Sequence, residues 1–323
     1  MGQMINTVTG PIKPEQLGKT RMHEHFFYEW PGATGDATMW EVSRETVVAR
    51  GVVVAKLLLE QGFKTVIDAT TNDAGRNPEW LKEISEKSGL QIICCTGYYF
   101  DRSSGLGYWK HRSIFTDVVK EIEELFTTEV EKGIGKTGIK AGVIKVCISN
   151  HITNADGWFA TAGAKSQKAT GVPLISHTQN GSEALELAGR LLGNGAAPAK
   201  VVIGHMCGQP DAAYHEQILK LGASVALDRV GITKWGFPSD EQRLELLQKL
   251  LAGGWGGQVF LSQDATGVNM ARPLPHKSPA DAPYTADHFA ILQGEFVPAA
   301  LAAGVTQAQI DQILVENPAR LFA

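Results

Sequence analysis

Eight short apolar segments alternate with longer helix-like segments, and this order limits the possible fold more than any other feature of the sequence. Each apolar segment is rich in β-branched residues and bounded by glycine or turn residues, which is typical of buried strands. The strand-like segments are residues 19–22, 63–69, 91–96, 141–147, 172–176, 201–204, 223–227 and 258–262. The helix-like segments are residues 42–61, 78–88, 114–133, 158–170, 182–192, 212–220 and 241–252, followed by 285–303 and 306–316. Eight strands that are each followed by a helix predict an α/β fold, the (β/α)8 TIM barrel with a parallel sheet.

The size and composition agree with one globular domain. The chain has 323 residues, of which 43% are hydrophobic, and no change of composition marks a linker, so we expect residues 1–323 to form a single barrel domain. The net charge of −4 includes no basic stripe, which argues against nucleic acid as a partner. No apolar run reaches membrane-spanning length, and the beginning of the chain lacks the features of a signal segment. The four cysteines form no disulfide framework, so we expect a cytoplasmic protein.

Lys145 lies in the centre of the predicted strand 141–147, where the cost of removing an ammonium group from water is large. Three states would allow a lysine there: an ion pair with an acidic residue, a neutral amine, or a chemically modified side chain. A neutral amine can react with CO₂ to form a carbamate, whose two oxygens can each bind a cation. The strand alone leaves these alternatives open.

Five other polar residues stand at or just after the ends of predicted strands. His23 and His25 follow the first strand, and strand alternation places them on one face. His177 follows the fifth strand, His205 the sixth and Asp264 the eighth. In a parallel barrel all these ends meet at one mouth, where this fold builds its active sites. Four histidines, an aspartate and a buried lysine at one rim predict a metal site.

These segments resemble the metal-site motifs of the phosphotriesterase family within the amidohydrolase superfamily. The motifs are His23-x-His25, Gly-Val-Ile-Lys145-Val, Ser-His177-Thr, Ile-Gly-His205 and Ser-Gln-Asp264. The resemblance extends from His23 to the C-terminal segment 316–322. It implies a centre of two divalent ions: His23, His25 and Asp264 hold the more buried ion, and His177 and His205 hold the more exposed one. Carboxylated Lys145 and a hydroxide bridge them; zinc is preferred, with manganese, cobalt or iron as alternatives.

The resemblance also implies a reaction class, metal-assisted hydrolysis, with the bridging hydroxide as the nucleophile and Asp264 as its base. Tyr99 and Arg229 match residues that position the substrate in this family, and Trp235 is a further candidate for the pocket wall. We expect a lactonase or carboxylic-ester hydrolase that acts on a small-molecule ester or lactone. An organophosphate triesterase, an amide hydrolase and a non-catalytic binding protein on the same barrel are the alternatives.

Two loops, and one position at which the sequence differs from the family pattern, affect which substrate we expect. Residues 26–30 are aromatic and either line an apolar pocket or pack over the barrel mouth. Residues 265–286 contain four prolines and are expected to form an ordered lid. The family usually has an aspartate three positions after the histidine that matches His205, and Gly208 stands there. Because glycine cannot relay a proton, we rank lactones above unactivated amides. We also expect a homodimer.

Overall fold

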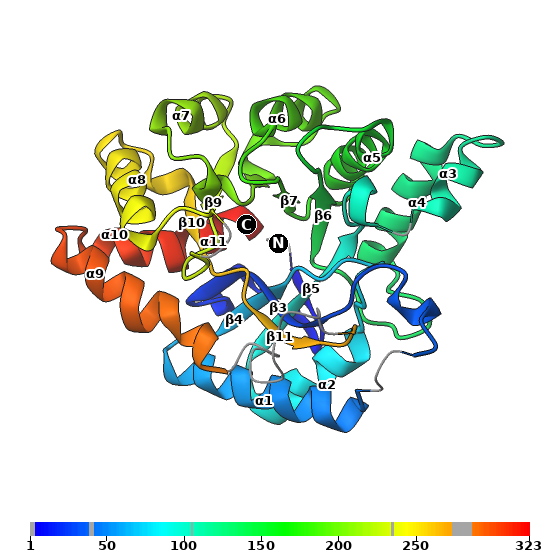
Figure 1. Cartoon of the computed structure of the whole chain (residues 1–323), viewed down its shortest axis with the longest axis horizontal. Coiled ribbons are helices and arrows are strands. Elements are labelled where there is room, and N and C mark those ends of the chain that lie inside the picture. Colours follow the sequence, from blue (N-terminus) through cyan, green and yellow to red (C-terminus); the bar gives the residue numbers. More distant parts are fainter. Residues whose placement is uncertain (1–3, 39–41, 105, 234–235, 273–285) are drawn as a thin grey trace.

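The computed structural model describes residues 4–38, 42–104, 106–233, 236–272 and 286–323, and its centre is a curled parallel sheet inside a ring of helices (Figure 1). A short antiparallel hairpin, β1 and β2, precedes the sheet. The strands are β1 Ile5–Thr7, β2 Gly10–Ile12, β3 Thr20–Tyr28, β4 Thr65–Asp68, β5 Gln91–Gly97, β6 Val143–Cys147, β7 Leu174–His177, β8 Val201–Ile203, β9 Ser224–Leu227, β10 Val259–Leu261 and β11 Thr266–Asn269.

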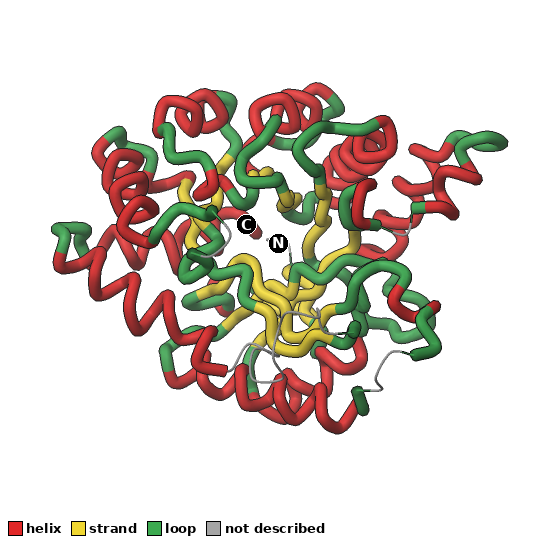
Figure 2. The backbone as a smooth tube through the Cα atoms, in the orientation of Figure 1, coloured by secondary structure: helices red, strands yellow, loops and turns green. Residues whose placement is uncertain are grey.

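The sheet has the order β10-β9-β8-β7-β6-β5-β4-β3-β11, and every pairing in it is parallel. Its two ends, β10 and β11, are separated by only four residues of the chain, 262–265. The backbone N–H of Asp264 donates to His23 O at 3.1 Å, and that of His25 donates to Ala265 O at 2.9 Å. The curled shape is visible in the backbone trace (Figure 2). The α/β class, the parallel sheet and the eight predicted strands are confirmed.

Two strands differ from their predicted extents. The first strand, predicted to end at residue 22, continues to Tyr28, because residues 25–28 pair with β11, a strand that the sequence did not predict. The eighth predicted strand is interrupted after Leu261 and resumes as β11. Both differences come from a pairing between distant segments, which local periodicity does not report.

Helices occupy the predicted places between and after the strands, and the short helices α3 and α11 were not predicted. Their bounds are α1 Arg44–Glu60, α2 Pro78–Ser88, α3 Gly107–Arg112, α4 Val118–Glu131, α5 Asn154–Thr170, α6 Ala184–Gly193, α7 Ala212–Lys220, α8 Asp240–Ala252, α9 Val297–Ala302, α10 Gln307–Asp311 and α11 Asn317–Phe322. The predicted capping signals operate: Asn77 Oδ1 accepts from the N–H of Trp80, and Ser239 forms a capping box with Gln242. None of the helices described has the length and apolar character needed to cross a membrane.

The two helices predicted nearest the C-terminus are not continuous α-helices. Each contains a π-helical segment, η8 Leu292–Phe296 and η9 Gln312–Glu316. Pro298 and Pro318 follow these segments. A proline has no N–H to donate to the carbonyl four residues before it, and the wider π turn absorbs this lost hydrogen bond.

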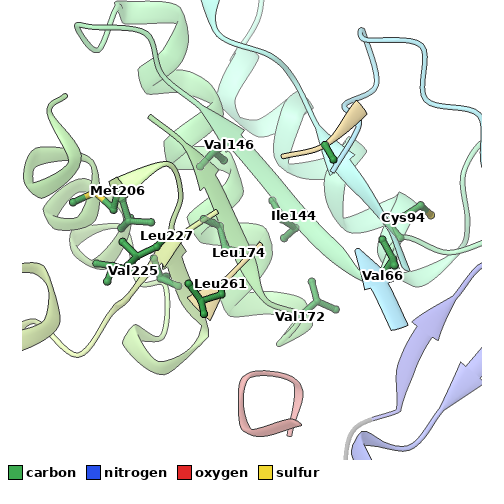
Figure 3. Close-up of a cluster of buried hydrophobic side chains, with 14 of the residues drawn as sticks. Val66, Cys94, Ile144, Val146, Val172, Leu174, Met206, Val225, Leu227 and Leu261 are labelled. Carbon is green, nitrogen blue, oxygen red and sulfur yellow. The ribbon is translucent and has the colours of Figure 1, made fainter. Parts of the chain in front are cut away.

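The strands pack apolar side chains on both faces of the sheet. The outward face packs against the helices through residues such as Ile144, Leu174 and Val225, which appear in Figure 3. The inward face carries a second buried cluster that includes Val143, Ile175 and many other apolar residues. Neighbouring residues of one strand thus face opposite sides, as strand geometry requires.

Candidate metal centre

Polar side chains begin two residues beyond the inward-facing apolar cluster. Along β6, Val143 belongs to this inner cluster, and Lys145 is the next residue on the same face. His177 stands in the same relation to Ile175 on β7. The carboxyl ends of the parallel strands therefore bring these side chains together. His23 and His25 join them from β3, within the strand instead of at its end as predicted.

Lys145 is buried, with only 2% of its surface exposed. Its Nζ lies 2.8 Å from His23 Nε2. Among the residues that the structure describes, no carboxylate forms an ion pair with this lysine. The prediction of an ion pair between Lys145 and an acidic residue, one of the three states considered from the sequence, is therefore wrong within the described part of the chain. A charged ammonium group has no acidic partner here to offset its loss of water.

The buried histidines contact one another through ring nitrogens. His205 Nε2 lies 2.8 Å from His177 Nδ1, and the rings of His23 and His205 stack with centroids 4.8 Å apart. Burial, followed by the neighbouring Lys145, lowers the pKa of His23 to about 3. Burial also lowers the pKa of His205 and holds that of His177 well below its ordinary value. The three rings are therefore neutral at neutral pH, which is the state that binds metal ions.

Asp228, directly after β9, lies behind two of these histidines. Its Oδ2 is 2.9 Å from His23 Nδ1, and its Oδ1 is 2.9 Å from His205 Nδ1. Oδ1 also accepts from the backbone N–H of His205 at 2.8 Å. Burial alone would raise the pKa of Asp228, but its contacts with His205 and His23 hold it below its ordinary value. A carboxylate acceptor places each ring proton on Nδ1 and leaves both Nε2 lone pairs facing inward. Sequence reasoning missed this role.

His25 is oriented by a hydroxyl group instead. Its Nδ1 lies 2.8 Å from Thr70 Oγ1, and this hydroxyl donates to Phe27 O at 3.2 Å. Because the hydroxyl proton is used on the carbonyl, the oxygen accepts from the His25 Nδ1–H. The Nε2 lone pair of His25 is therefore also available on the inner side.

Asp264 faces the same space from the segment between β10 and β11. Its Oδ1 lies 3.2 Å from His25 Nε2, and its Oδ2 accepts from Arg229 Nε at 3.0 Å. Burial alone would raise the pKa of Asp264, but its polar surroundings, which include the Arg229 guanidinium, hold it well below its ordinary value. Asp264 and His205 have φ angles of 51° and 58°. Non-glycine residues rarely adopt this left-handed conformation, and such strain is concentrated at functional sites.

The donor set fits divalent metal ions. One nitrogen or oxygen atom from each of His23, His25 and Asp264 lies within 4.8 Å of the others, and the same holds for His23, His205 and Asp228. In the second group the Asp228 oxygens take the Nδ1 protons, so Asp228 supports the ligands and is not itself one. Neutral imidazoles with one carboxylate suit zinc and its neighbours in the transition series.

A cavity of about 270 Å³ opens onto these groups. Of the residues predicted for the site, His23, His25, Lys145, His177, Asp264, Tyr99 and Arg229 line it. His205 is fully buried beside them and does not line the cavity. Trp235 lies outside the described residues. Ile232 and Phe237 also line the cavity, although no sequence pattern distinguished them.

The aromatic segment 26–30 divides between the two roles considered for it. Phe26 and Phe27 are core residues, each only 1% exposed. Tyr28 and Trp30 line the cavity, and the Trp30 ring lies 6.1 Å from that of Tyr99. The Tyr99 ring in turn contacts His177, with centroids 5.2 Å apart. The pocket interpretation thus holds for residues 28–30, and the packing interpretation holds for Phe26 and Phe27.

Gly208 has a structural reason that the sequence did not reveal. A Cβ at this position would lie 2.5 Å from the Cα of Asn180, so no side chain fits without moving the backbone. Asn180 Oδ1 accepts from Arg229 Nη1 at 3.0 Å. Arg229 Nε also donates to Asp264 Oδ2, so this arginine connects Asn180 with the site.

Comparisons with known proteins agree with this architecture. The family model described as the phosphotriesterase family matches residues 3–322. A protein named phosphotriesterase homology protein from Mycobacterium tuberculosis is 28% identical over 98% of this chain and 97% of its own. The organophosphorus hydrolase from Deinococcus radiodurans superposes with a TM-score of 0.95 at 41% identity, covering 100% of this chain and 97% of that one. A mutant of a phosphotriesterase-like lactonase from the same organism gives a TM-score of 0.94 at 41% identity, covering 99% and 100%. The chain therefore belongs to the phosphotriesterase family.

Proposed function

We propose that this protein is a metal-dependent hydrolase that opens lactones or related small carboxylic esters. The observation that carries this proposal is the single cavity onto which His23, His25, Lys145, His177 and Asp264 all open. Its other walls are largely aromatic and aliphatic, which suits the uncharged acyl part of an ester. The lactonase named among the solved structures supports the same substrate class.

We propose that the curled sheet is a closed (β/α)8 barrel with a binuclear centre at its C-terminal mouth. His23, His25 and Asp264 would hold one ion, and His177 and His205 the other, with zinc as the preferred metal. Lys145 would bridge them as a carbamate. This change would replace a buried ammonium group, which has no acidic partner among the described residues, by an anion in contact with two cations. The two ions, when bound, supply a hydroxide at neutral pH and polarise the ester carbonyl.

The chain's own residues position this chemistry. Asp264 orients the nucleophile and takes its proton, while Arg229, at 3.0 Å from Oδ2, keeps the carboxylate in place. Asp228 keeps the Nε2 lone pairs of His23 and His205 directed inward. Tyr99, beside His177, forms the wall against which the substrate is held.

Phosphotriester hydrolysis is the second candidate function. The similarity to an organophosphorus hydrolase at 41% identity over the whole chain favours it. The same nucleophile and the same Asp264 would serve attack on phosphorus. Amide hydrolysis ranks lower, because a leaving amine needs a proton and Gly208 offers no acidic side chain. A non-catalytic binding protein ranks lowest, because every predicted ligand position keeps a ligating residue.

Three further properties belong to the proposal. The match of the family model to residues 3–322 supports one domain over residues 1–323. The free, buried state of all four cysteines supports a cytoplasmic location. The exposed side chains of Tyr108, Ile114 and Phe115, on and just after α3, support a homodimer that covers them. Light scattering of the native protein and of a Phe115→Lys variant measures the oligomeric state.

A hydrolysis panel tests the proposed function. The metal-replete enzyme is assayed on lactones, aryl esters, phosphotriesters and N-acyl amides, with a chelated sample as the control. We expect the highest kcat/KM on a lactone or ester and loss of turnover on chelation. Faster turnover of phosphotriesters would favour the second candidate. Faster turnover of an amide than of every lactone and ester would overturn the proposal.

A further inference from the structure

A second cavity, of about 550 Å³, adjoins the first. The two cavities share Glu29 and Pro31, which follow directly after β3. The second cavity extends away from the histidines, towards Asn72, Arg76 and Trp80. A substrate whose reacting end lies in the first cavity therefore has room for a further group beyond Glu29.

The backbone and the side-chain stem of Glu29 are held firmly in place. Its N–H donates to Ala74 O at 3.0 Å, and its Cγ packs over Gly75, where an added Cβ would lie only 2.7 Å away. Gly75 has φ of +84°, so this turn needs glycine for its backbone as well as for the space. Among the described residues, no hydrogen bond or ion pair reaches the half-buried carboxylate of Glu29. Burial raises its pKa, which reflects the same lack of a partner.

The described wall of the second cavity favours a cationic group over an anionic one. Its one cationic side chain among the described residues, Arg76, is already neutralised, because Nη1 and Nη2 donate to the two oxygens of Glu129 at 2.7 and 2.9 Å. Glu29 contributes a carboxylate to the wall. Among the described residues no cation competes for this carboxylate, so it would attract an added cation and repel an anionic group.

Aromatic side chains share the walls of the two cavities with Glu29. Tyr28 and Trp30 line the first cavity on either side of Glu29 in the chain, and their rings are 5.9 Å apart in an edge-to-face arrangement. Trp80 forms part of the wall of the second cavity. Aromatic faces combined with a carboxylate are the chemistry that recognises ammonium groups.

We propose that Glu29 binds an ammonium group on the non-reacting part of the substrate. The substrate class is thus an ester or lactone with a cationic group, whose acyl part fills the apolar cavity and whose cation reaches the junction of the two cavities. This inference rests on the proposed function, since it names a substrate class for the same site. Glu29 acts here as a specificity residue and takes no part in bond cleavage.

The test compares two series of 4-nitrophenyl esters of matched chain length, one ending in an ammonium group and one in a methyl group. For the wild type we expect kcat/KM to favour the ammonium ester of the best length by about tenfold, the scale of one partly exposed charged contact. Glu29→Gln should abolish this preference, and Glu29→Asp should keep part of it. Glu60→Gln, at the exposed end of α1, is the matched control and should leave the preference unchanged. An equal preference in the wild type and Glu29→Gln, or none in the wild type, would overturn the inference.

Direct binding separates this inference from the proposed function. If the metal-replete wild type hydrolyses neither ester series, the proposed ester chemistry fails. Calorimetric titration with a hexyltrimethylammonium salt then decides the role of Glu29 without any turnover. We expect binding that weakens about tenfold in Glu29→Gln and is unchanged in Glu60→Gln. Equal affinities of the wild type and Glu29→Gln would contradict the role.

Discussion

The inside of the curled sheet has two layers that the same strands build in opposite ways. The layer towards the amino ends is apolar and includes Ile67, Ile93, Val143, Ile175 and Phe260, each at most 3% exposed. The layer at the carboxyl ends is equally buried but polar, and it includes His23, Lys145, His177, His205 and Asp228. On β6, β7 and β9 a step of two residues leads from one layer to the other.

The difference separates the source of stability from the source of function. The apolar layer gains free energy simply by leaving water, about 1.5–3 kcal/mol for each large side chain. The polar layer loses free energy on burial unless its groups find partners. Asp228 satisfies two histidines, but among the described residues only a histidine contacts the Lys145 amine. The polar layer therefore contains groups that can bind metal ions, whereas burial alone stabilises the apolar layer.

The largest expected effect concerns Asp264, at the open side of the polar layer. Asp264→Asn should lower kcat by about 10²–10⁴-fold, because an amide cannot accept the nucleophile's proton. Bound metal should fall by much less, since the amide oxygen can still face the ions. Steady-state kinetics together with metal analysis measure both quantities, and Asp287→Asn on the exposed surface is the control. Activity that falls only in proportion to bound metal would make Asp264 a ligand but not the base.

The apolar layer should respond in the opposite way. Phe260→Ala removes a ring that is 2% exposed and should lower the free energy of unfolding by about 3–5 kcal/mol. Its kcat per folded molecule should change little, because the phenyl ring contributes no group to the polar layer. Urea unfolding and kinetics at saturating metal test the two parts. A loss of kcat comparable to that in Asp264→Asn would show that the layers are not separable.

A smaller effect is expected behind the histidines. The side chain of Asp228→Asn has almost the same shape as that of the wild type. Its amide nitrogen is a donor and cannot accept a hydrogen bond from a ring N–H, so one histidine must change tautomer. Metal affinity should weaken about 10–100-fold, the usual cost of losing such a supporting carboxylate. Competition with a chromogenic chelator gives the affinities. Unchanged affinity would mean that Asp228 does not set the tautomers.

The smallest effect is a pH dependence of the metal-free protein. The folded state holds the pKa of His23 at about 3 against an ordinary value of 6.5, so the unfolded chain binds more protons between these values. The contribution of His23 to stability is therefore fully present above pH 6.5 and is lost as the pH falls below it, by about 1.4 kcal/mol per pH unit. Urea unfolding of the wild type and His23→Asn between about pH 7 and pH 5 measures this slope. The same slope in both proteins would contradict the assignment.

The sequence predicted what local periodicity encodes. The strand containing Lys145 and the positions of His177 and His205 followed from short apolar runs and from the rule that parallel strands end at one edge. The pairing of β11 with β3 was missed, and so was the contact of Asp228 with both His23 and His205. These features depend on which distant segments are neighbours, and no single stretch carries that information. The walls formed by Ile232 and Phe237 were missed for the same reason.

The most direct test of the central claim, that the buried polar layer is a two-metal site, is the metal content of the wild type and Lys145→Ala. After equilibration with zinc and removal of the free ions, elemental analysis should find two equivalents per wild-type chain and most of them lost from Lys145→Ala. Short carboxylic acids added with zinc should partly restore both metal and turnover, because their oxygens replace those of the carbamate. A Lys145→Ala protein with two bound ions and normal turnover, without any added acid, would contradict the claim.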